Sequence, residues 1–294
     1  MSNRKHIINE IVSGWLRKKK GRPLRILETH QGLGIATNMY RHYGCVISFE
    51  NDYNVYYQMR SKFLDAISLD LFLQQGQSLL EFIELCGVRQ KYPVIIPDKP
   101  TDSRLGIVKL SEYGFKFDIV DVDPYGSPHE FIPNTFDLLD DRSILLITTG
   151  EMHYVRFRPL HAMAPYDIQA NKSLRTTRSF FKDDNVLVIG ASVVQGGLEK
   201  SMGVYPIFIY DYYEAQSGVQ RIGFWVRKQI GRIRKISLKD CLFYDPLLGT
   251  YMIRCSVERR NAKGTKIWRF NRNCPEEEIE NYILECLDTY INLH

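Results

Sequence analysis

The sequence predicts an α/β fold: a doubly wound, mainly parallel sheet of seven strands with an antiparallel hairpin at its edge. Short apolar runs occur at residues 24–27, 45–49, 117–122, 143–148 and 185–189, and each is separated from the next by enough chain for a helix or a longer crossover. Two further apolar segments, 205–212 and 219–227, flank residues 214–218 and predict the hairpin. A chain of 294 residues is long enough to bury one large core.

Helices are expected near both ends of the chain. The first covers about residues 6–20, where apolar residues recur at helical spacing until Pro23 ends the segment. The second covers residues 275–293, and three glutamates in its first turn favour the helix dipole. Residues 91–110 contain three prolines among polar residues, so we expect an inserted loop there and no helix.

The character of the chain changes at about residue 230, where basic strands replace the apolar runs. We therefore expect a main domain over residues 1–230 and a small basic α+β appendage over residues 231–294.

Composition excludes several classes of protein. No apolar run approaches the roughly 20 residues that span a bilayer, and the N-terminus lacks the apolar segment of a secretory signal. The six cysteines form no CxxC pair and no cysteine–histidine group with zinc-site spacing. We expect a soluble, cytoplasmic protein with reduced thiols, no metal and no membrane contact. The sequence leaves the oligomeric state open.

The net charge of +5 is unevenly placed. Basic residues cluster at the end of the first helix and late in the chain, with tryptophan and phenylalanine among the late ones. This composition is typical of a surface that neutralises phosphates and stacks on bases, although solvated strand faces would have it too. The candidate nucleic-acid contacts are Lys18, Lys19, Lys20, Arg221, Arg227, Arg232 and Arg234.

The loop after the first predicted strand has features of a cofactor-binding turn. Glu28 ends the strand, and His30, Gly32 and Gly34 follow at alternate positions. In a doubly wound sheet this loop lies beside the switch point, where an adenosyl ligand binds over the strand ends and glycines let the backbone approach it. These four residues are candidate cofactor contacts, and a plain tight turn is the structural alternative.

Further cofactor candidates follow along the chain. An acid at the end of the second strand typically accepts both ribose hydroxyls, and either Glu50 or Asp52 stands in that place. Gln77 is a candidate contact to the adenine amino group, and Asp121 in the predicted strand 117–122 completes the set.

Residues 117–128, FDIVDVDPYGSP, carry the most specific chemistry, because an apolar strand runs directly into a carboxylate, a proline and an aromatic ring. The amine of a nucleobase is a poor nucleophile and gains from oxygens that accept its hydrogens. Asp123 and the Pro124 carbonyl could supply those oxygens, and Tyr125 could stack on the base. A buried strand that ends in a proline turn would use the same residue types.

These residues, with Asn3-Arg4, Gly34-Ile35 and Asn51-Asp52, resemble the tRNA (guanine-N2-)-dimethyltransferases, most clearly in Asp-Pro-aromatic-Gly-Ser-Pro. The resemblance implies a class I, Rossmann-like methyltransferase sheet, S-adenosyl-L-methionine as cofactor, guanine N2 in tRNA as substrate, and Asp123 as the residue beside the amine. It favours Asp52 as the ribose acid, whereas the strand pattern favours Glu50. The chain departs from the family at His30-Gln31-Gly32 and has a much shorter C-terminal part.

Two other functions fit parts of the pattern. An N6-adenine or N4-cytosine DNA methyltransferase also places an Asp and a Pro-Tyr pair after a strand, but here Gly126-Ser127-Pro128 follows the ring. A non-catalytic nucleic-acid-binding homologue would need only the basic surface. RNA, with tRNA first, is the expected partner, and DNA is the alternative.

Overall fold

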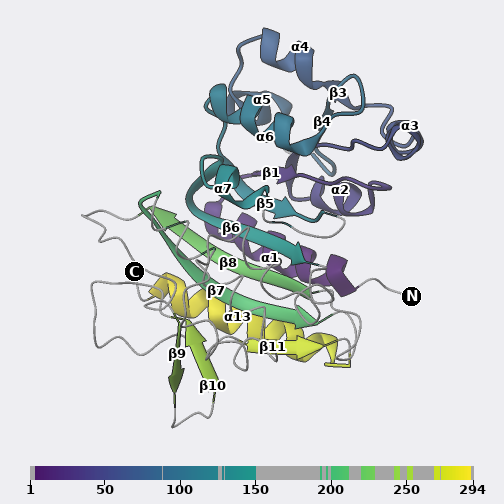
Figure 1. Ribbon diagram of the computed structural model, residues 1–294. Coiled ribbons are helices and arrows are strands. Elements are labelled where there is room, and N and C mark those ends of the chain that lie inside the picture. The colour runs from purple at the N-terminus through teal and green to yellow at the C-terminus, as the bar shows by residue number, and fades with distance from the viewer. Residues whose placement is uncertain are drawn as a thin grey trace, which may run out of the picture.

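The computed structural model describes residues 4–87, 89–124, 128, 130–149, 193, 197, 200–211, 220–228, 242–245, 250–253, 268–271 and 273–292. Its centre is a nine-stranded sheet with the order β11-β7-β8-β6-β5-β1-β2-β4-β3 (Figure 1). The strands are β1 (Leu24–Glu28), β2 (Gly44–Ser48), β3 (Ile67–Ser68), β4 (Val94–Ile96), β5 (Phe117–Val122), β6 (Leu139–Thr149), β7 (Met202–Asp211), β8 (Gln220–Lys228) and β11 (Trp268–Asn271). A separate antiparallel pair joins β9 (Leu242–Asp245) to β10 (Thr250–Ile253).

Eight of the nine strands point the same way, because β8 alone pairs antiparallel with both neighbours, β6 and β7. The predicted fold class is confirmed: a Rossmann-like, mainly parallel sheet with an antiparallel hairpin, β7–β8. Six of the nine strands in the described sheet match predicted strands, whereas β3, β4 and β11 were not predicted. The expected strand at 185–189 and hairpin turn at 214–218 lie outside the described residues.

Helices cover both faces of the sheet. One face carries α1 (Arg4–Lys20), α2 (Ile35–Tyr40) and α13 (Glu276–Asn292), which share a buried cluster with Ile26, Ile119 and Ile144. The other carries α4 (Leu69–Gln74), α5 (Leu79–Cys86), α6 (Ser103–Glu112) and α7 (Ile132–Thr135), which pack with Leu27, Val120 and Leu145. Because successive strand side chains point to opposite faces, buried residues all along a strand serve both clusters. Beyond β2 lies α3 (Tyr53–Arg60), which packs on β4, the strand next to the edge strand β3.

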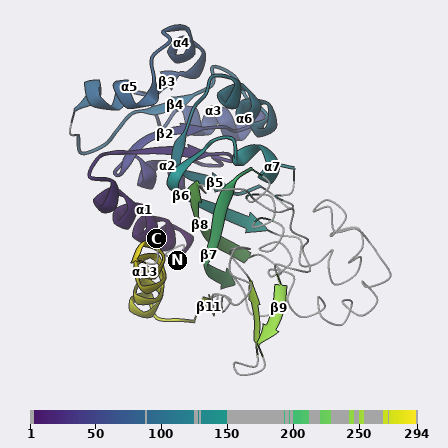
Figure 2. The ribbon, with the colours of Figure 1, turned by 90° about the vertical axis from the view of Figure 1, so that its left-hand side faces the viewer.

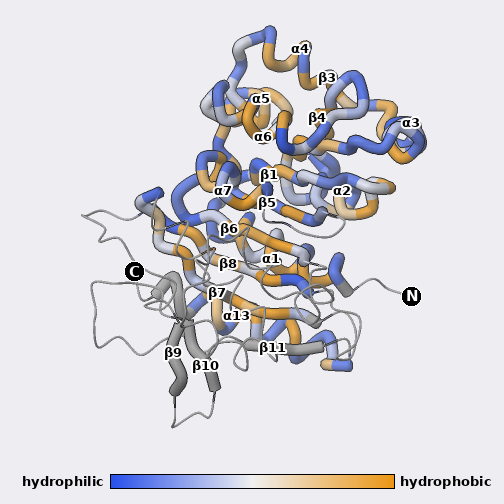
Figure 3. The backbone as a smooth tube through the Cα atoms, in the orientation of Figure 1, coloured by the Kyte–Doolittle hydropathy of each residue, from blue (hydrophilic) through white to orange (hydrophobic). Residues whose placement is uncertain are grey.

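The central strands have apolar segments between polar residues, as the run Ile144, Leu145, Leu146 and Ile147 of β6 shows (Figure 3). Among the described residues, no helix is both long and apolar enough to cross a membrane.

The C-terminal elements join the main body. β11 pairs parallel with β7, and α13 lies beside α1 on the same face of the sheet (Figure 2). Ile279, Ile283 and Leu287 of α13 are fully buried against this core. The expected appendage over residues 231–294 therefore includes a strand, β11, that joins the main sheet and a helix, α13, that packs into the core of the first 230 residues.

The prediction of a loop over residues 91–110 is wrong, because the segment contains β4 and most of α6. The three prolines stand outside both elements: Pro93 precedes β4, Pro97 follows it, and Pro100 comes before α6. Asp102 caps the helix by accepting the backbone N–H of Arg104. Because prolines flank these short elements, residues 91–110 have the same composition as an irregular loop.

Candidate cofactor and substrate site

The loops after β1, β2, β4 and β5 meet at the carboxyl edge of the sheet. Backbone hydrogen bonds tie them together: Thr29 N–H donates to the Asp121 carbonyl at 2.9 Å, Gln31 N–H to Phe49 at 2.8 Å, and Thr101 N–H to Glu50 at 2.8 Å. In open α/β sheets ligands bind at this edge, in the crevice near the switch point of the strand order. The loops are therefore held in place before any ligand arrives.

The first loop needs both of its glycines. Gly32 and Gly34 have φ of +53° and +74°, in the left-handed region that favours glycine. A Cβ on Gly34 would lie 2.6 Å from the ring of Phe63, whereas one on Gly32 would have nothing within 4 Å. Gly34 therefore leaves no room for a side chain beside Phe63, which follows α3, whereas Gly32 borders open space.

The carboxylate of Glu50 joins two loops. Its Oε2 accepts the backbone N–H of Gly32 and its Oε1 that of Asp52, each at 2.9 Å. Asp52 has another task, since its Oδ1 accepts the Val55 N–H at 2.9 Å and caps α3. Of the two acids that the sequence offers, Glu50 is the one that touches the glycine loop.

Glu28 and His30 are less exposed to a ligand than the sequence suggested. Glu28 is buried and accepts a hydrogen bond from the Thr37 hydroxyl of α2, and burial raises its pKa to about 8. The His30 Nδ1 lies 2.7 Å from the Thr29 hydroxyl, and its ring packs edge-on against Phe131 at 4.7 Å. Burial lowers the pKa of His30 to about 4, so the ring is neutral at pH 7.

Gln31 is a polar residue of this loop that sequence reasoning missed. Both its amide nitrogen and its amide oxygen are buried without a hydrogen-bond partner among the described residues. Buried amides usually have partners. The signal in the sequence was the departure from the small residues usual before the first-turn glycine.

Asp121 and Arg221 form a buried ion pair beneath the edge. Arg221 Nη2 lies 2.8 Å from Asp121 Oδ2 and 2.7 Å from Asn9 Oδ1, and the Tyr40 hydroxyl donates to the same Asp121 oxygen at 2.7 Å. The two side chains are 0% and 1% exposed. The prediction that Arg221 contacts nucleic acid is wrong, because its guanidinium is enclosed in the core. Asp121 is likewise buried: its Oδ2 bonds to core partners, and its Oδ1 is enclosed without a hydrogen-bond partner among the described residues.

Asp123 and Pro124 follow β5 directly at the carboxyl edge. The Asp123 carboxylate is partly exposed, and its Oδ2 contacts the ammonium of Lys5 from the start of α1. Tyr125, the third member of the predicted catalytic set, lies outside the described residues.

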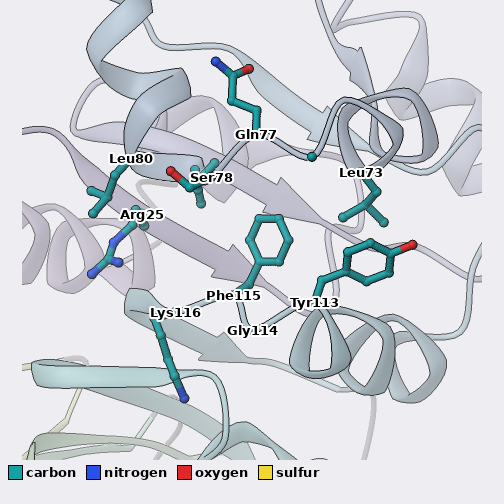
Figure 4. A pocket seen from close by; sticks show the side chains of 11 residues that line it. Arg25, Leu73, Gln77, Ser78, Leu80, Tyr113, Gly114, Phe115 and Lys116 are labelled. Carbon is teal, nitrogen blue, oxygen red and sulfur yellow. The ribbon is translucent and has the colours of Figure 1, made fainter.

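Gln77, a predicted cofactor contact, lies away from the carboxyl edge of the sheet. Gln77 lines a cavity of about 260 Å³ together with Arg25 and Lys116 (Figure 4). Arg25 is near the start of β1 and Lys116 precedes β5, so this cavity lies at the amino edge of the sheet. The loop between α4 and α5 therefore lies at the edge opposite to the glycine loop.

The basic end of α1 also lies at the amino edge. Lys20 is 3.4 Å from Asp118, the second residue of β5, and Lys19 is 3.2 Å from Asp288 of α13. Lys18 is exposed. Arg227 comes late in β8, opposite Gly203, and so stands towards the same edge. Arg232 and Arg234 lie outside the described residues.

Comparison with known proteins supports the fold. No protein-family model and no curated protein matches the sequence. Among solved structures, Trm1 from Pyrococcus horikoshii in complex with S-adenosyl-L-methionine is similar with a TM-score of 0.55 at 15% identity, over 97% of this chain and 72% of that one. A putative O-methyltransferase from Klebsiella pneumoniae has a TM-score of 0.42 at 12% identity, over 77% of this chain and 81% of that one. TomG, an O-methyltransferase from Streptomyces achromogenes, has a TM-score of 0.41 at 10% identity, over 78% and 81%.

At this identity the likeness concerns the fold. The sequence predicts a resemblance to the tRNA (guanine-N2-)-dimethyltransferases. This resemblance is confirmed at the level of the fold, which Trm1 shares with 97% of this chain.

Proposed function

We propose that the protein is an S-adenosyl-L-methionine-dependent N-methyltransferase that acts on the exocyclic amine of a nucleobase, with guanine N2 in tRNA as its substrate. One observation carries the proposal: the Glu50 carboxylate and Asp123 come from separate loops to the same edge of a sheet with this fold. Similar structures include Trm1 with S-adenosyl-L-methionine and several proteins described as methyltransferases.

The residues at the carboxyl edge fit an adenosyl ligand. Glu50 uses one lone pair of each oxygen on backbone N–H groups, which leaves acceptor capacity on both oxygens for a ribose diol. The Gln31 amide is buried with both its donor and its acceptor unused among the described residues. The open space beside Gly32 lets a ligand approach the backbone. Glu50 is the proposed ribose acid, and Gly32 and Gly34 shape the turn.

When bound, S-adenosyl-L-methionine supplies a methyl group on a sulfonium, so the leaving group needs no assistance. The protein must then place the amine and stabilise the charge that develops on its nitrogen. Asp123 would accept one N–H of the amine and the Pro124 carbonyl the other, which orients the nitrogen lone pair and offsets its growing positive charge. Tyr125 would stack on the base. The proton displaced from the amine would leave to Asp123 or to water.

The expected substrate contacts are the basic residues Lys18, Lys19, Lys20, Arg227, Arg232 and Arg234. An RNA that reaches both Asp123 and the end of α1 must extend from one edge of the sheet to the other. β5 has six residues, and at about 3.3 Å per residue it spans about 20 Å. A folded RNA such as tRNA is large enough for this, whereas a short single strand confined to the carboxyl edge would miss the lysines.

The test is methyl transfer from radiolabelled S-adenosyl-L-methionine to total tRNA, other RNA and DNA, followed by mass spectrometry of the nucleosides. The proposal predicts N2-methylguanosine or N2,N2-dimethylguanosine from tRNA. N6-methyladenine or N4-methylcytosine in DNA would establish the alternative enzyme. Binding of RNA without cofactor binding or transfer would identify a non-catalytic homologue.

A further inference from the structure

The start of α1 reaches the end of β5 through two side chains one helical turn apart. Lys5 contacts the Asp123 carboxylate, and the amide nitrogen of Asn9 lies 3.4 Å from Asp121. Four residues of helix rise about 6 Å, and two residues of strand advance about 6.6 Å. The two spacings match, so α1 can contact both acids at once along one face of the sheet.

The pair between Lys5 and Asp123 is shielded from solvent. The two side chains are 12% and 21% exposed, far less than in the surface pair between Lys109 and Asp70, which are 42% and 46% exposed. Burial lowers the pKa of Lys5 to about 8, against the charge of Asp121, which favours the ammonium. An ion pair shielded in this way is screened less by salt and holds its geometry better than an exposed pair.

The contact uses only one oxygen of Asp123. Lys5 bonds to Oδ2, and no bond to Oδ1 is recorded among the described residues. A carboxylate has lone pairs for about four hydrogen bonds over its two oxygens. An ammonium fixed on one oxygen therefore sets the rotamer of the side chain and still leaves the other oxygen for a donor from outside.

We propose that Lys5 is the positioning residue of the methyl-transfer site: its ammonium holds Oδ2 of Asp123 so that Oδ1 faces the substrate amine. This inference rests on the proposed function, since it assigns Asp123 to the amine. It gives α1 a part in the site that the basic residues at its other end do not have.

Steady-state kinetics of Lys5→Met and Lys5→Arg test the role. A misplacement of a catalytic group by about 1 Å costs on the order of 100-fold in rate, so Lys5→Met is expected to lower kcat by about 10- to 100-fold with little change in KM for either substrate. Lys5→Arg keeps the charge and is expected to restore much of kcat. Lys109→Met, which removes an exposed lysine from a carboxylate on α4, is the matched control and should leave kcat unchanged.

The pH profile separates positioning from a merely structural role. Lys5 faces several charged or titratable groups, which are Asp121 and Asp123 of the β5 edge, Glu28 of β1, Arg221 of β8, His6 of α1 and His30 of the first loop. In the wild type, kcat should fall as the pH rises through about 8 and the ammonium is lost. Lys5→Arg should lack this fall, whereas a fall caused by any other group or by the substrate would persist in both proteins.

A titration without substrate tests the contact itself. In protein labelled with [13Cε]lysine, the Lys5 signal, assigned by its loss in Lys5→Arg, should titrate well below an ordinary lysine, and lower still in Asp123→Asn. A Lys5 signal that titrates normally and ignores Asp123→Asn would refute the contact.

The outcomes for the two proposals are distinct. Normal kcat in Lys5→Met, or a faster variant, would refute the role of Lys5 and leave the methyltransferase proposal intact; a faster variant would mean that Lys5 competes with the substrate. No transfer by the wild type to any nucleic acid would refute the proposed function and the role of Lys5 with it.

Discussion

Glu50 accepts the backbone N–H of Gly32 at 2.9 Å, so a side chain that follows β2 fixes the loop that follows β1. The same carboxylate accepts the Asp52 N–H, and both its oxygens keep lone pairs at the carboxyl edge. If it holds the ribose, one residue both shapes the cofactor loop and binds the cofactor.

Glu50→Ala is therefore expected to weaken S-adenosyl-L-methionine binding by at least about 10-fold, because hydrogen bonds to a charged group contribute about 1.5–3 kcal/mol each. Asp52→Ala should instead lose the cap of α3, at a cost of about 1 kcal/mol in the free energy of unfolding, with little effect on affinity. Calorimetric titration and urea denaturation of both variants measure the two effects. The reverse pattern would assign the ribose to Asp52.

Arg221→Met should destabilise the protein by about 3–5 kcal/mol, because it leaves the Asp121 carboxylate buried without its cation. Lys18→Met, an exposed change, should alter the free energy of unfolding by less than about 0.5 kcal/mol. Urea denaturation of the two variants provides the comparison. If Arg221→Met kept its stability but bound RNA more weakly, Arg221 would be a nucleic-acid contact, as the sequence suggested.

Gly34→Ala and Gly32→Ala should differ. Both put alanine in a left-handed conformation, which costs about 1–2 kcal/mol, but only at Gly34 does the added Cβ meet the ring of Phe63, at 2.6 Å. The free energy of unfolding should therefore fall more for Gly34→Ala. Equal losses, measured by urea denaturation, would mean that the Phe63 ring moves away without cost.

Glu28 should make stability depend on pH. Its pKa is raised by burial from 4.5 to about 8, so the folded state holds a proton that the unfolded state releases. The stability that it contributes is full below 4.5 and is lost as the pH rises to about 8. Glu28→Gln removes the proton exchange, so its free energy of unfolding relative to the wild type should rise with pH in this window, by at most about 1.4 kcal/mol per pH unit.

That difference isolates Glu28 from His30, whose lowered pKa acts in the opposite direction between about 4 and 6.5. A constant difference between the two proteins across the window would show that Glu28 is ionised in the folded state.

The sequence predicted the parts of the fold that depend on local pattern. Apolar runs gave the central strands, and the string around Asp123 placed that residue at a strand end, because both signals lie within a few neighbouring residues. The burial of Arg221 depends on Asp121, 100 residues away, and the contact of Lys5 depends on Asp123, 118 residues away. Basic side chains look alike in a sequence whether they face solvent or a buried acid.

The position of Gln77 could not be predicted, because it depends on the order of the strands in the sheet. A contact to the adenine would require Gln77 to follow a strand at the carboxyl edge, but Gln77 lies between α4 and α5, and the strand beside β2 is β4, which comes after α5. Since strands of a parallel sheet end at one edge and begin at the other, a misplaced strand moves its loop residues to the wrong side of the sheet.

The measurement that most directly tests the account is a comparison of Asp123→Ala with the wild type in two assays, S-adenosyl-L-methionine titration and methyl transfer to tRNA. The account predicts nearly unchanged cofactor affinity and a loss of transfer by at least about 100-fold, because Asp123 acts on the amine and its positioning. Transfer at the wild-type rate by Asp123→Ala would contradict the assignment of this edge of the sheet as the catalytic site.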